Sequence, residues 1–572
     1  AAPESRTGAY SPYERSTIER VLARRGGTLE PAPEGQAIEA IDVEVLEVIE
    51  DRDPAPGFLN VLHRRSRDYV VRREVLLRPG EPYRKVVADE TARNLRRLPA
   101  LSLVVCVPTR GSAPGKVRLL VIVKDIWSLR LSTTVSYTAG GLESLTVSPL
   151  EINLLGTQQS AGGTFAYAPE SYSYGLQYGV PRLLGSRVAA AAAATLYVNR
   201  ARGEPEGSSV TLDVGQPLYS TRTAWAWAFE GEYTYRFTRR YVNAALATYD
   251  AEATADDDRI PFQWRGRTAA AGALVTRSFG WEQKLDLSAG ARALALAAEL
   301  PGLEGYDAAA VDEFRRRNVP RGDTRVGPIV QARAYTTNFL RTFDAETLGL
   351  QEDVRLGHDL YLRLYPVARA FGSSRDFFGA YAGAHYTVAL GDGYARAAIA
   401  STTETELASG RQAEGLLEAS ARVLTPRLGF GRLVFDARAL SRYRNFLNRT
   451  TFLGGATRLR GYPSSFLVGK DYVSSNLELR SRPLELFSVL VGAAAFYDVG
   501  GAFDGFDAAR IYQGAGAGLR VLFPQVNRIV LRGDLGFPLE PGGPPPGVPP
   551  ASFYVAFEQA FAPYVVAPGE GR

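Results

Sequence analysis

The sequence predicts a mainly β protein, in which a small α+β domain precedes an antiparallel transmembrane β-barrel. Two observations carry this prediction. Before Asp125 the sequence mixes short strand and helix patterns, whereas after it long segments alternate apolar and polar residues. Alternation over about 9–11 residues is typical of a tilted strand that crosses a membrane, and it exceeds the roughly 5–6 residues of most soluble strands. The sequence contains no run of about 18 apolar residues, so we expect no membrane-spanning helix.

Residues 1–36 are predicted to form an N-terminal tail with one helix, from Tyr13 to Arg25. The apolar residues of this helix fall on one face, and Gly26-Gly27 ends it. The chain begins with Ala1-Ala2-Pro3 and contains no methionine. We therefore expect a mature chain from which a signal peptide was removed.

Residues 37–125 are predicted to form the α+β domain, in the order strand, helix, helix, strand, strand. Strand patterns cover 38–48, 101–107 and 116–123, helical patterns cover 58–65 and 86–98, and 70–78 is predicted to be extended. Two helices would cover one face of a three-stranded sheet, which leaves a sheet edge available to an incoming strand. We expect the one histidine of this domain, His63, to lie on a helix surface.

Residues 126–561 are predicted to form the barrel, and a C-terminal tail follows at 562–572. In the segment 224–237, aromatic residues dominate the odd positions, while the even positions carry alanines and charged residues. Because a soluble β-sandwich needs an apolar inner face, charged residues opposite aromatic ones favour a hydrated lumen and a lipid-facing exterior. Turn signals separate close to twenty candidate strands, and long polar loops are predicted at 302–324 and 541–550.

The first and last barrel strands are predicted to meet and close the barrel. They run from Ile126 to Thr138 and from Ser552 to Phe561. Closure pairs the backbone groups that lipid cannot satisfy. The residues predicted to form this seam are Trp127, Leu129, Leu131, Phe557 and Phe561. A seam of this kind could open and expose a strand edge.

Two short motifs lie towards the C-terminal end of the barrel sequence. The loop motif consists of Arg460, Gly461 and Tyr462, in a Gly-, Ser- and Pro-rich loop at 453–470. The strand motif consists of Phe496, Asp498 and Gly500, which share one face of an apolar strand. Glu478, on the strand between them, is predicted to face the lumen as well. Since a planar guanidinium suits bidentate contact with a carboxylate, we predict that Arg460 reaches Asp498 and Glu478 inside the barrel, and we call this arrangement the latch.

From about residue 37 to residue 561, the chain resembles the BamA/TamA superfamily of outer-membrane assembly and secretion proteins (bacterial surface antigen type). The domain order carries the resemblance, together with an Arg-Gly-Phe/Tyr loop motif matched at 460–462 and a Phe-x-Asp-x-Gly strand motif matched at 496–500. The resemblance implies that residues 37–125 are a POTRA (polypeptide-transport-associated) domain. It also implies a barrel of sixteen strands, five of them after the loop. Since the sequence count reaches twenty, either the count divides single strands in two or this barrel is larger than its relatives.

The resemblance also implies a function and a location. It implies an outer-membrane protein of a Gram-negative bacterium, with the POTRA domain and the N-terminus in the periplasm. The implied function is to assist the insertion and assembly of β-barrel proteins into the outer membrane, with the POTRA domain receiving clients. The implied partners are outer-membrane lipids, client outer-membrane or secreted proteins, and periplasmic or lipoprotein partners. The latch either only holds the barrel shut or also takes part in gating.

Two other functions stay open on the sequence. One is a two-partner-type secretion pore that exports an unfolded protein. Pores of that type carry an N-terminal plug helix, a role that the segment from Tyr13 to Arg25 could take. The other is a structural outer-membrane component of a larger assembly.

The composition argues against several further classes of function. The net charge is +5 and no long basic run occurs, so we expect no nucleic-acid partner. One cysteine, Cys106, and three histidines cannot build a Cys/His metal cluster or an internal disulfide. The sequence also lacks a Gly-x-Ser-x-Gly motif or a comparable catalytic grouping. We therefore expect no enzyme activity and no cofactor or metal.

Overall fold

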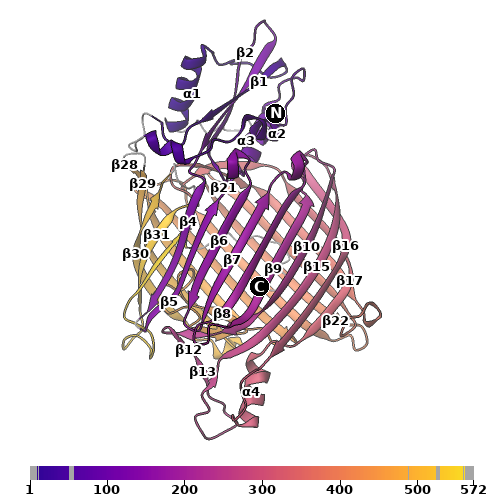
Figure 1. Cartoon of the computed structure of the whole chain (residues 1–572), viewed down its shortest axis with the longest axis vertical. Helices are drawn as coiled ribbons and strands as arrows, with labels where there is room; N and C mark the ends of the chain where they lie inside the picture. Colours follow the sequence, from indigo (N-terminus) through magenta and orange to yellow (C-terminus); the bar gives the residue numbers. More distant parts are fainter. Residues whose placement is uncertain are drawn as a thin grey trace.

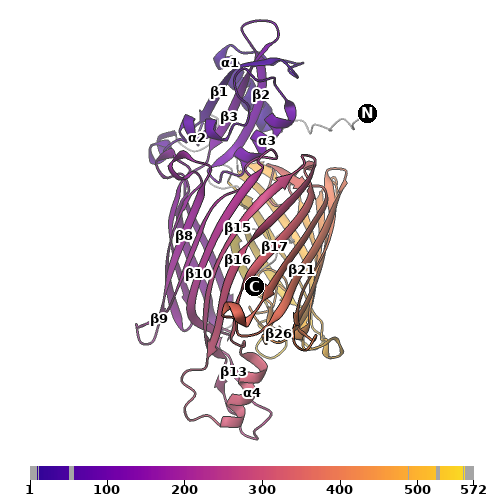
Figure 2. The same ribbon diagram turned by 90° about the vertical axis from the view of Figure 1, so that its right-hand side faces the viewer.

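A closed antiparallel barrel forms the body of the molecule, and a smaller N-terminal region lies over one of its two mouths (Figures 1 and 2). The computed structural model describes residues 10, 12–50, 57–138, 140–486, 489–523, 529–557, 559 and 560. Within these residues the structure is mainly β, and the barrel has 20 strands. The predicted fold class is therefore confirmed. Of the described helices, none is long and apolar enough to cross a membrane.

The N-terminal region (residues 12–125) is a three-stranded sheet with helices on both faces. Its elements are α1 (Pro12–Arg25), β1 (Ala37–Leu46), the 3₁₀ helix η1 (Gly57–Leu62), α2 (Asp68–Glu74), α3 (Lys85–Arg96), β2 (Leu101–Arg110) and β3 (Lys116–Asp125). The central strand β3 is parallel to β1 and antiparallel to β2. Helices α2 and α3 pack on one face of the sheet through Val71 and Leu95. Helix α1 packs on the opposite face through Ile18 and Val21.

Two predictions for this region are wrong. The segment 70–78 was predicted to be extended, but its first half belongs to α2, because Val70, Val71 and Glu74 are buried on one side of a helix. Packing on the sheet overrides the preference of paired valines for strands. His63 was predicted on a helix surface, but it is buried, with Nε2 3.1 Å from Oδ2 of Asp125. The burial of Asp125 explains this, since its carboxylate requires polar partners away from water.

The barrel strands follow one another around the barrel in chain order. They are β4 (Leu129–Thr138), β5 (Gly141–Glu151), β6 (Ser160–Ala168), β7 (Ser171–Val180), β8 (Ala189–Asn199), β9 (Pro205–Gln216), β10 (Trp225–Arg239), β15 (Gln263–Phe279), β16 (Gln283–Glu299), β17 (Asp323–Thr336), β20 (Gly357–Val367), β21 (Phe377–Leu390), β22 (Gly393–Glu406), β23 (Gln412–Leu424), β24 (Gly431–Asn445), β27 (Asp471–Ser481), β28 (Leu484–Leu486), β29 (Val489–Phe503), β30 (Tyr512–Leu522), β31 (Leu531–Pro538) and β32 (Ser552–Phe557). β27 and β28 both pair with β29 and are successive parts of one strand.

The barrel is larger than the resemblance implied. Five of its 20 strands follow the loop at 453–470, as expected, so the strands beyond sixteen all precede it. The alternating segments counted in the sequence are thus separate strands, and some are long. β15 and β16 have 17 residues each. Because every added hairpin extends the ladder without breaking closure, the motifs of the last five strands do not fix the size of the barrel.

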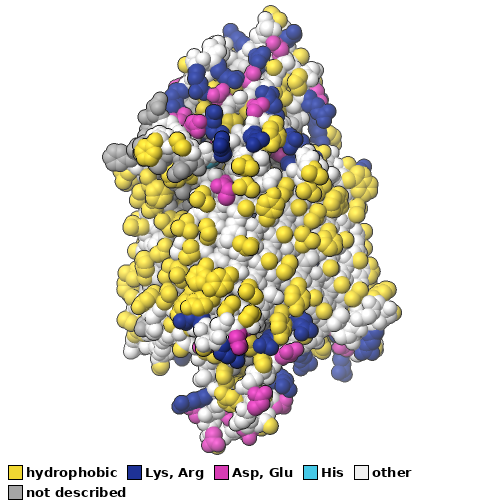
Figure 3. All heavy atoms as spheres, in the orientation of Figure 1, with side chains coloured by type: hydrophobic (Ala, Val, Ile, Leu, Met, Phe, Trp, Pro, Cys, Tyr) yellow, Lys and Arg dark blue, Asp and Glu magenta, His cyan; other side chains and the backbone are white. Residues whose placement is uncertain are grey.

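Hydrophobic side chains cover the exterior of the barrel in a band, with charged side chains above and below it (Figure 3). On β10, Trp225, Trp227 and Phe229 are exposed. On β16, Lys284 and Asp286 are buried on the inner side. An apolar exterior around a polar interior is the arrangement of a membrane barrel, which confirms the predicted transmembrane class.

Connections at the two mouths differ in length. We call the mouth below the N-terminal region the near mouth and the opposite one the far mouth. Far-mouth connections contain β11 (Tyr241–Val242), β12 (Ala245–Leu246), β13 (Thr248–Tyr249), β14 (Ile260–Pro261), α4 (Ala308–Asn318), β25 (Thr451–Leu453), β26 (Leu467–Gly469) and the 3₁₀ helices η4 (Arg369–Phe371) and η5 (Phe506–Ala508). In the part of the chain that the structure describes, near-mouth connections are short turns, which include η2 (Leu154–Gly156) and η3 (Leu183–Gly185), except for one hairpin of β18 (Phe339–Phe343) and β19 (Gln351–Arg355).

Helix α4 corrects a further prediction, since it lies within the stretch 302–324 that was expected to be a loop. Asp307 caps the helix, because its side chain accepts hydrogen bonds from the backbone N–H groups of Ala309 and Ala310. Phe314 is buried against Phe262. The cap and the buried Phe314 side chain both stabilise α4 outside the barrel wall.

Candidate functional site: the latch inside the barrel

The loop that carries Arg460 enters the lumen from the far mouth. It runs between β25 and β26, which pair with each other at the base of the loop. Its residues Leu459 and Tyr462 are fully buried. Gly461 has a φ of +106°, a conformation that L side chains rarely adopt, and this turns the chain between Arg460 and Tyr462.

Arg460 is completely buried at the centre of the latch. Its Nε donates a hydrogen bond to Oδ2 of Asp498 (2.8 Å) and its Nη2 donates to Oδ1 (2.9 Å), so this pair is bidentate. Its Nη1 donates to Oε2 of Glu478 (2.9 Å) and to Oδ2 of Asp534 (3.2 Å). The backbone N–H of Arg460 donates to Asp498 as well, at 3.1 Å. One guanidinium therefore joins β27, β29 and β31.

The strand motif surrounds this contact. The Cζ atom of Arg460 lies 3.4 Å from the ring centroid of Phe496, which is a close cation–π contact. Gly500 leaves room for the base of the loop, because a Cβ atom there would lie 2.9 Å from Cδ2 of Leu453. The three motif residues thus stack on the arginine, bind it, and make space for its loop.

Further arginines neutralise the other two carboxylates. Glu478 also contacts Arg480 (2.8 Å) and Arg520 (3.4 Å). Asp534 also contacts Arg520 (2.6 Å) and Arg532 (2.7 Å). Asp498 differs: among the described residues its only cationic partner is Arg460, and the amide Nδ2 of Asn476 donates to its Oδ1 at 2.8 Å. The charge of Asp498 is therefore the one that depends on the loop.

The loop is also bound to the last strand of the barrel. The hydroxyl of Tyr554 on β32 donates a hydrogen bond to the carbonyl of Tyr462 (2.7 Å), and the hydroxyl of Ser552 donates to the carbonyl of Gly461 (3.3 Å). The hydroxyl of Tyr462 donates to the carbonyl of Gln513 on β30 (2.9 Å). The loop motif therefore connects the seam strand β32 with the latch.

Some latch residues were not singled out from the sequence. They are Asn476, Asp534, Arg520, Arg532, Ser552 and the wall glycines Gly514 and Gly536. The alternation of residues along β31 indicates which of them face the lumen, since Arg532, Asp534 and Gly536 share one face of Leu531–Pro538. A Cβ atom at Gly514 would lie 2.3 Å from the carbonyl oxygen of Arg460, and one at Gly536 would lie 2.7 Å from the nitrogen of Gly461. The loop can approach the wall only because these positions lack side chains.

We expect Gly536→Ala to displace the loop and weaken the latch, although the backbone of Gly536 itself tolerates alanine. Overpacking of this kind typically costs about 1–3 kcal/mol. Thermal unfolding of the barrel in detergent micelles measures this loss. Gly533→Ala on the same strand is the matched control, because its Cβ would come no closer than 3.8 Å to any neighbour. Equal stability of the two variants would contradict the steric role of Gly536.

The first and last strands of the barrel meet at the seam, as predicted. In the part of β32 that the structure describes, the ladder with β4 contains the pairs Phe553–Tyr137, Tyr554–Ser136 and Val555–Val135. Of the predicted seam residues, Leu129 and Leu131 lie on β4 and Phe557 lies on β32, outside these three pairs, while Trp127 precedes β4. The remaining one, Phe561, lies outside the described residues.

The hairpin β18–β19 connects the latch to the N-terminal region from the near mouth. Asp353 forms an ion pair with Arg96 of α3 (2.7 Å), and the amide of Gln351 donates to Glu14 of α1 (2.5 Å). At its tip, the carbonyl of Ala345 accepts a hydrogen bond from Arg480, whose Nε donates to Glu478. Polar contacts thus run from the N-terminal helices to the latch.

Comparisons with known proteins found no match to a protein-family model and none to a curated protein. Among solved structures, the chain is similar to BamA from Haemophilus ducreyi lacking POTRA domains 1–3, with 13% identity over 96% of this chain and 94% of that chain, and a TM-score of 0.34. It is similar to CdiB from Acinetobacter baumannii, with 11% identity over 91% of this chain and 74% of that chain, and a TM-score of 0.42. It is also similar to CdiB from Escherichia coli, with 12% identity over 95% of this chain and 83% of that chain, and a TM-score of 0.41. Likeness at this level carries no argument about function.

Proposed function

We propose that this protein assists the insertion of β-barrel proteins into the outer membrane, and that its own barrel opens between β32 and β4 to do so. The observation that carries this proposal is the short ladder at that seam. Among the described residues, three pairs join β32 to β4, whereas ten join β4 to β5. Because lipid offers no alternative partner for backbone groups, strands separate at the least cost where the fewest pairs must break. An open seam presents a strand edge on which a client strand can form a ladder.

The contacts of the loop favour a latch that takes part in gating over one that only holds the barrel shut. Tyr554 and Ser552 bind the loop, and both belong to the strand that must move. Displacement of β32 breaks these hydrogen bonds, and release of the loop removes two of the side-chain contacts of β32. The state of the seam and the position of Arg460 are therefore coupled.

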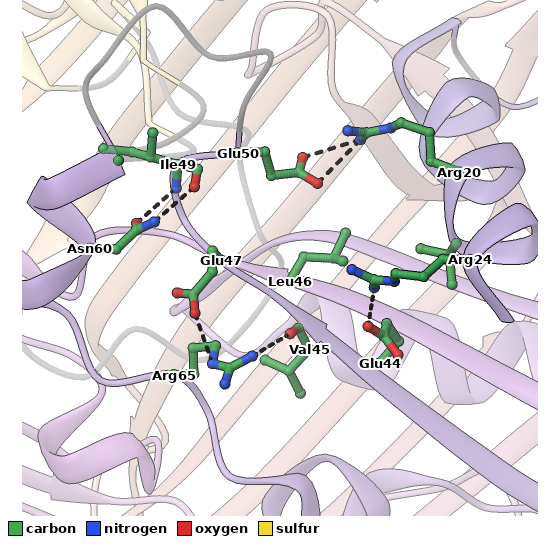
Figure 4. Close-up of a pocket in the computed structure, with 12 residues that line it drawn as sticks. Arg20, Arg24, Glu44, Val45, Leu46, Glu47, Ile49, Glu50, Asn60 and Arg65 are labelled. Carbon is green, nitrogen blue, oxygen red and sulfur yellow. Dashed lines mark hydrogen bonds and ion pairs between the residues drawn. The ribbon is translucent and has the colours of Figure 1, made fainter.

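We further propose that residues 37–125 are a periplasmic POTRA domain that receives clients at the edge of β1. The end of this strand borders a cavity of about 680 Å³ (Figure 4). In this cavity the carbonyl of Val45 is approached by the side chain of Arg65, at 3.5 Å. Side chains can move aside for an incoming backbone, which supports strand addition at this edge. Short turns on this side of the barrel support a periplasmic near mouth.

Purified protein in liposomes tests the proposed function. We expect a urea-denatured outer-membrane barrel protein to fold faster into liposomes that contain this protein than into empty ones. No acceleration with any of several barrel clients would overturn the proposal. Passage of an unfolded exoprotein into the liposomes would instead support a secretion pore. A stable copurifying partner without either activity would support a structural role.

Helix α1 covers the segment that could take the role of a plug helix in a secretion pore. It packs on the N-terminal sheet through Ile18 and Val21.

A further inference from the structure

A cleft of about 770 Å³ lies between the N-terminal region and the rim of the barrel. Its upper side is formed by the edge of β1 at Glu39 and by α2 and the residues that follow it. Its lower side is formed by two near-mouth turns, β7–β8 and β9–β10. Basic side chains gather where the N-terminal region meets the hydrophobic band of the barrel (Figure 3). The cleft therefore lies at the level where the headgroups of the adjoining leaflet are expected.

The cleft is strongly basic. Its lining includes six arginines, namely Arg72, Arg73, Arg78, Arg182, Arg187 and Arg222, against two carboxylates, Glu39 and Glu90. Arg182 and Arg187 contact Glu74 behind the lining. Arg73, Arg78 and Arg222 are exposed, and the described residues offer none of these three an ion pair. Three guanidinium groups are thus available to an anion.

Contacts with aromatic rings place two of the six lining arginines, Arg187 and Arg222, at the lipid interface. Arg222 lies 4.9 Å from the ring centroid of Trp281, and Arg187 lies 4.6 Å from that of Tyr219. Trp281 is 59% exposed on the turn between β15 and β16. Exposed tryptophan at the end of a barrel strand marks the boundary between hydrocarbon and headgroups.

A strip of small side chains, which we call the furrow, lies on the barrel exterior at the start of β8. Strand β8 starts with six alanines, Ala189–Ala194, and its exposed positions Ala192 and Ala194 carry no bulk. The paired positions on β7 are Tyr178 and Leu176, and those on β9 are Leu212 and Val210, all exposed. Large exposed side chains on both neighbouring strands therefore flank the methyl groups of the furrow. The turn that carries Arg182 and Arg187 joins β7 to the start of the furrow.

We propose that the cleft binds the headgroup of an anionic glycerophospholipid from the leaflet at the near mouth, and that an acyl chain of this lipid lies in the furrow of β8. The phosphodiester accepts hydrogen bonds from Arg73, Arg78 and Arg222, since guanidinium groups bind phosphate oxygens in pairs. Both sides of the cleft contribute arginines, so the lipid holds the N-terminal region to the barrel rim. This inference does not depend on the function proposed above.

Lipid binding to the purified protein in detergent, measured by native mass spectrometry with titrated phosphatidylglycerol or phosphatidylcholine, tests the proposal. We expect at least tenfold tighter binding of phosphatidylglycerol to the wild-type protein. The triple variant Arg73→Gln, Arg78→Gln, Arg222→Gln should lose this preference. The control triple variant Arg202→Gln, Arg259→Gln, Arg316→Gln removes the same charge from exposed far-mouth positions and should keep it.

A furrow variant separates a lipid from a free phosphodiester. Ala192→Leu with Ala194→Leu fills the furrow and should weaken phosphatidylglycerol binding at least threefold. Soluble glycerophosphoglycerol should compete poorly with the lipid for the wild-type protein. Equal binding of the two lipids by the wild-type protein would overturn the proposal. So would unchanged selectivity in the cleft variant, or competition by glycerophosphoglycerol as strong as that by the lipid. Heat-dependent mobility in gels shows that each variant retains a folded barrel.

Discussion

Arg460→Ala is expected to abolish most of the client-folding activity and to destabilise the barrel by about 3–5 kcal/mol, the usual cost of removing one member of a buried ion pair. The reason lies in Asp498. Glu478 and Asp534 keep Arg480, Arg520 and Arg532 after the change, but Asp498 loses its only cation among the described residues and stays completely buried. Barrel stability is measured by urea or thermal unfolding in micelles, and activity by the liposome assay.

Asp498→Ala should have an effect of similar size, and the double variant should cost much less than the sum, because the two residues share one interaction. Arg460→Lys should not restore activity, since an ammonium group cannot make the bidentate contact or reach the other carboxylates in the same geometry. Arg411→Ala, in an exposed turn at the far mouth, is the control. Normal assembly and activity of both Arg460→Ala and Asp498→Ala would show that the latch serves neither stability nor function.

A disulfide across the seam is expected to stop client folding while leaving the barrel intact. Val135 and Val555 face each other in the short ladder between β4 and β32. In a Cys106→Ala background, which contains no other thiol, Val135→Cys with Val555→Cys should crosslink on oxidation. The crosslinked protein should lose at least tenfold in client-folding rate, and reduction should restore it.

The control pair lies on the other edge of the same strand. Thr133→Cys with Val147→Cys crosslinks β4 to β5, which the mechanism leaves closed. This variant should keep its activity under oxidising conditions. If the crosslinked seam variant remains fully active, lateral opening between β4 and β32 is not part of the mechanism, and passage through the lumen becomes the better explanation of any transport.

The sequence revealed those parts of the site that follow from the alternation of side chains along one strand. Alternation placed Asp498 and Glu478 on the inner face, and the long loop placed Arg460 within reach of them. The register between neighbouring strands could not be predicted from this alternation. The register of β32 on β4 depends on the shear of the whole barrel, which a pattern of period two cannot encode. Gly536 looks like any other strand glycine until the loop above it is known.

Contacts with residues distant in sequence also explain the wrong predictions outside the barrel wall. Val70 and Val71 favour a strand as isolated residues, but α2 buries them against the sheet. His63 is polar and is followed by two arginines in the sequence, yet it is buried beside Asp125. The hairpin β18–β19 was not predicted as an inward element, because its partners on the barrel wall, such as Arg422 for Glu346 and Arg480 for the carbonyl of Ala345, are distant in sequence. In each case a distant partner determines the placement.

The ion-pair partners of Arg460 and the β32 hydroxyls that bind its loop all lie C-terminal to it in the chain. The carboxylates that bind Arg460 lie on β27, β29 and β31, and the hydroxyls that bind its loop lie on β32. All four strands are synthesised after the loop. A nascent or truncated chain that stops before β32 therefore carries an arginine whose loop is not yet secured. Only a chain that includes β32 can make the hydrogen bonds of Ser552 and Tyr554 to the loop that carries Arg460.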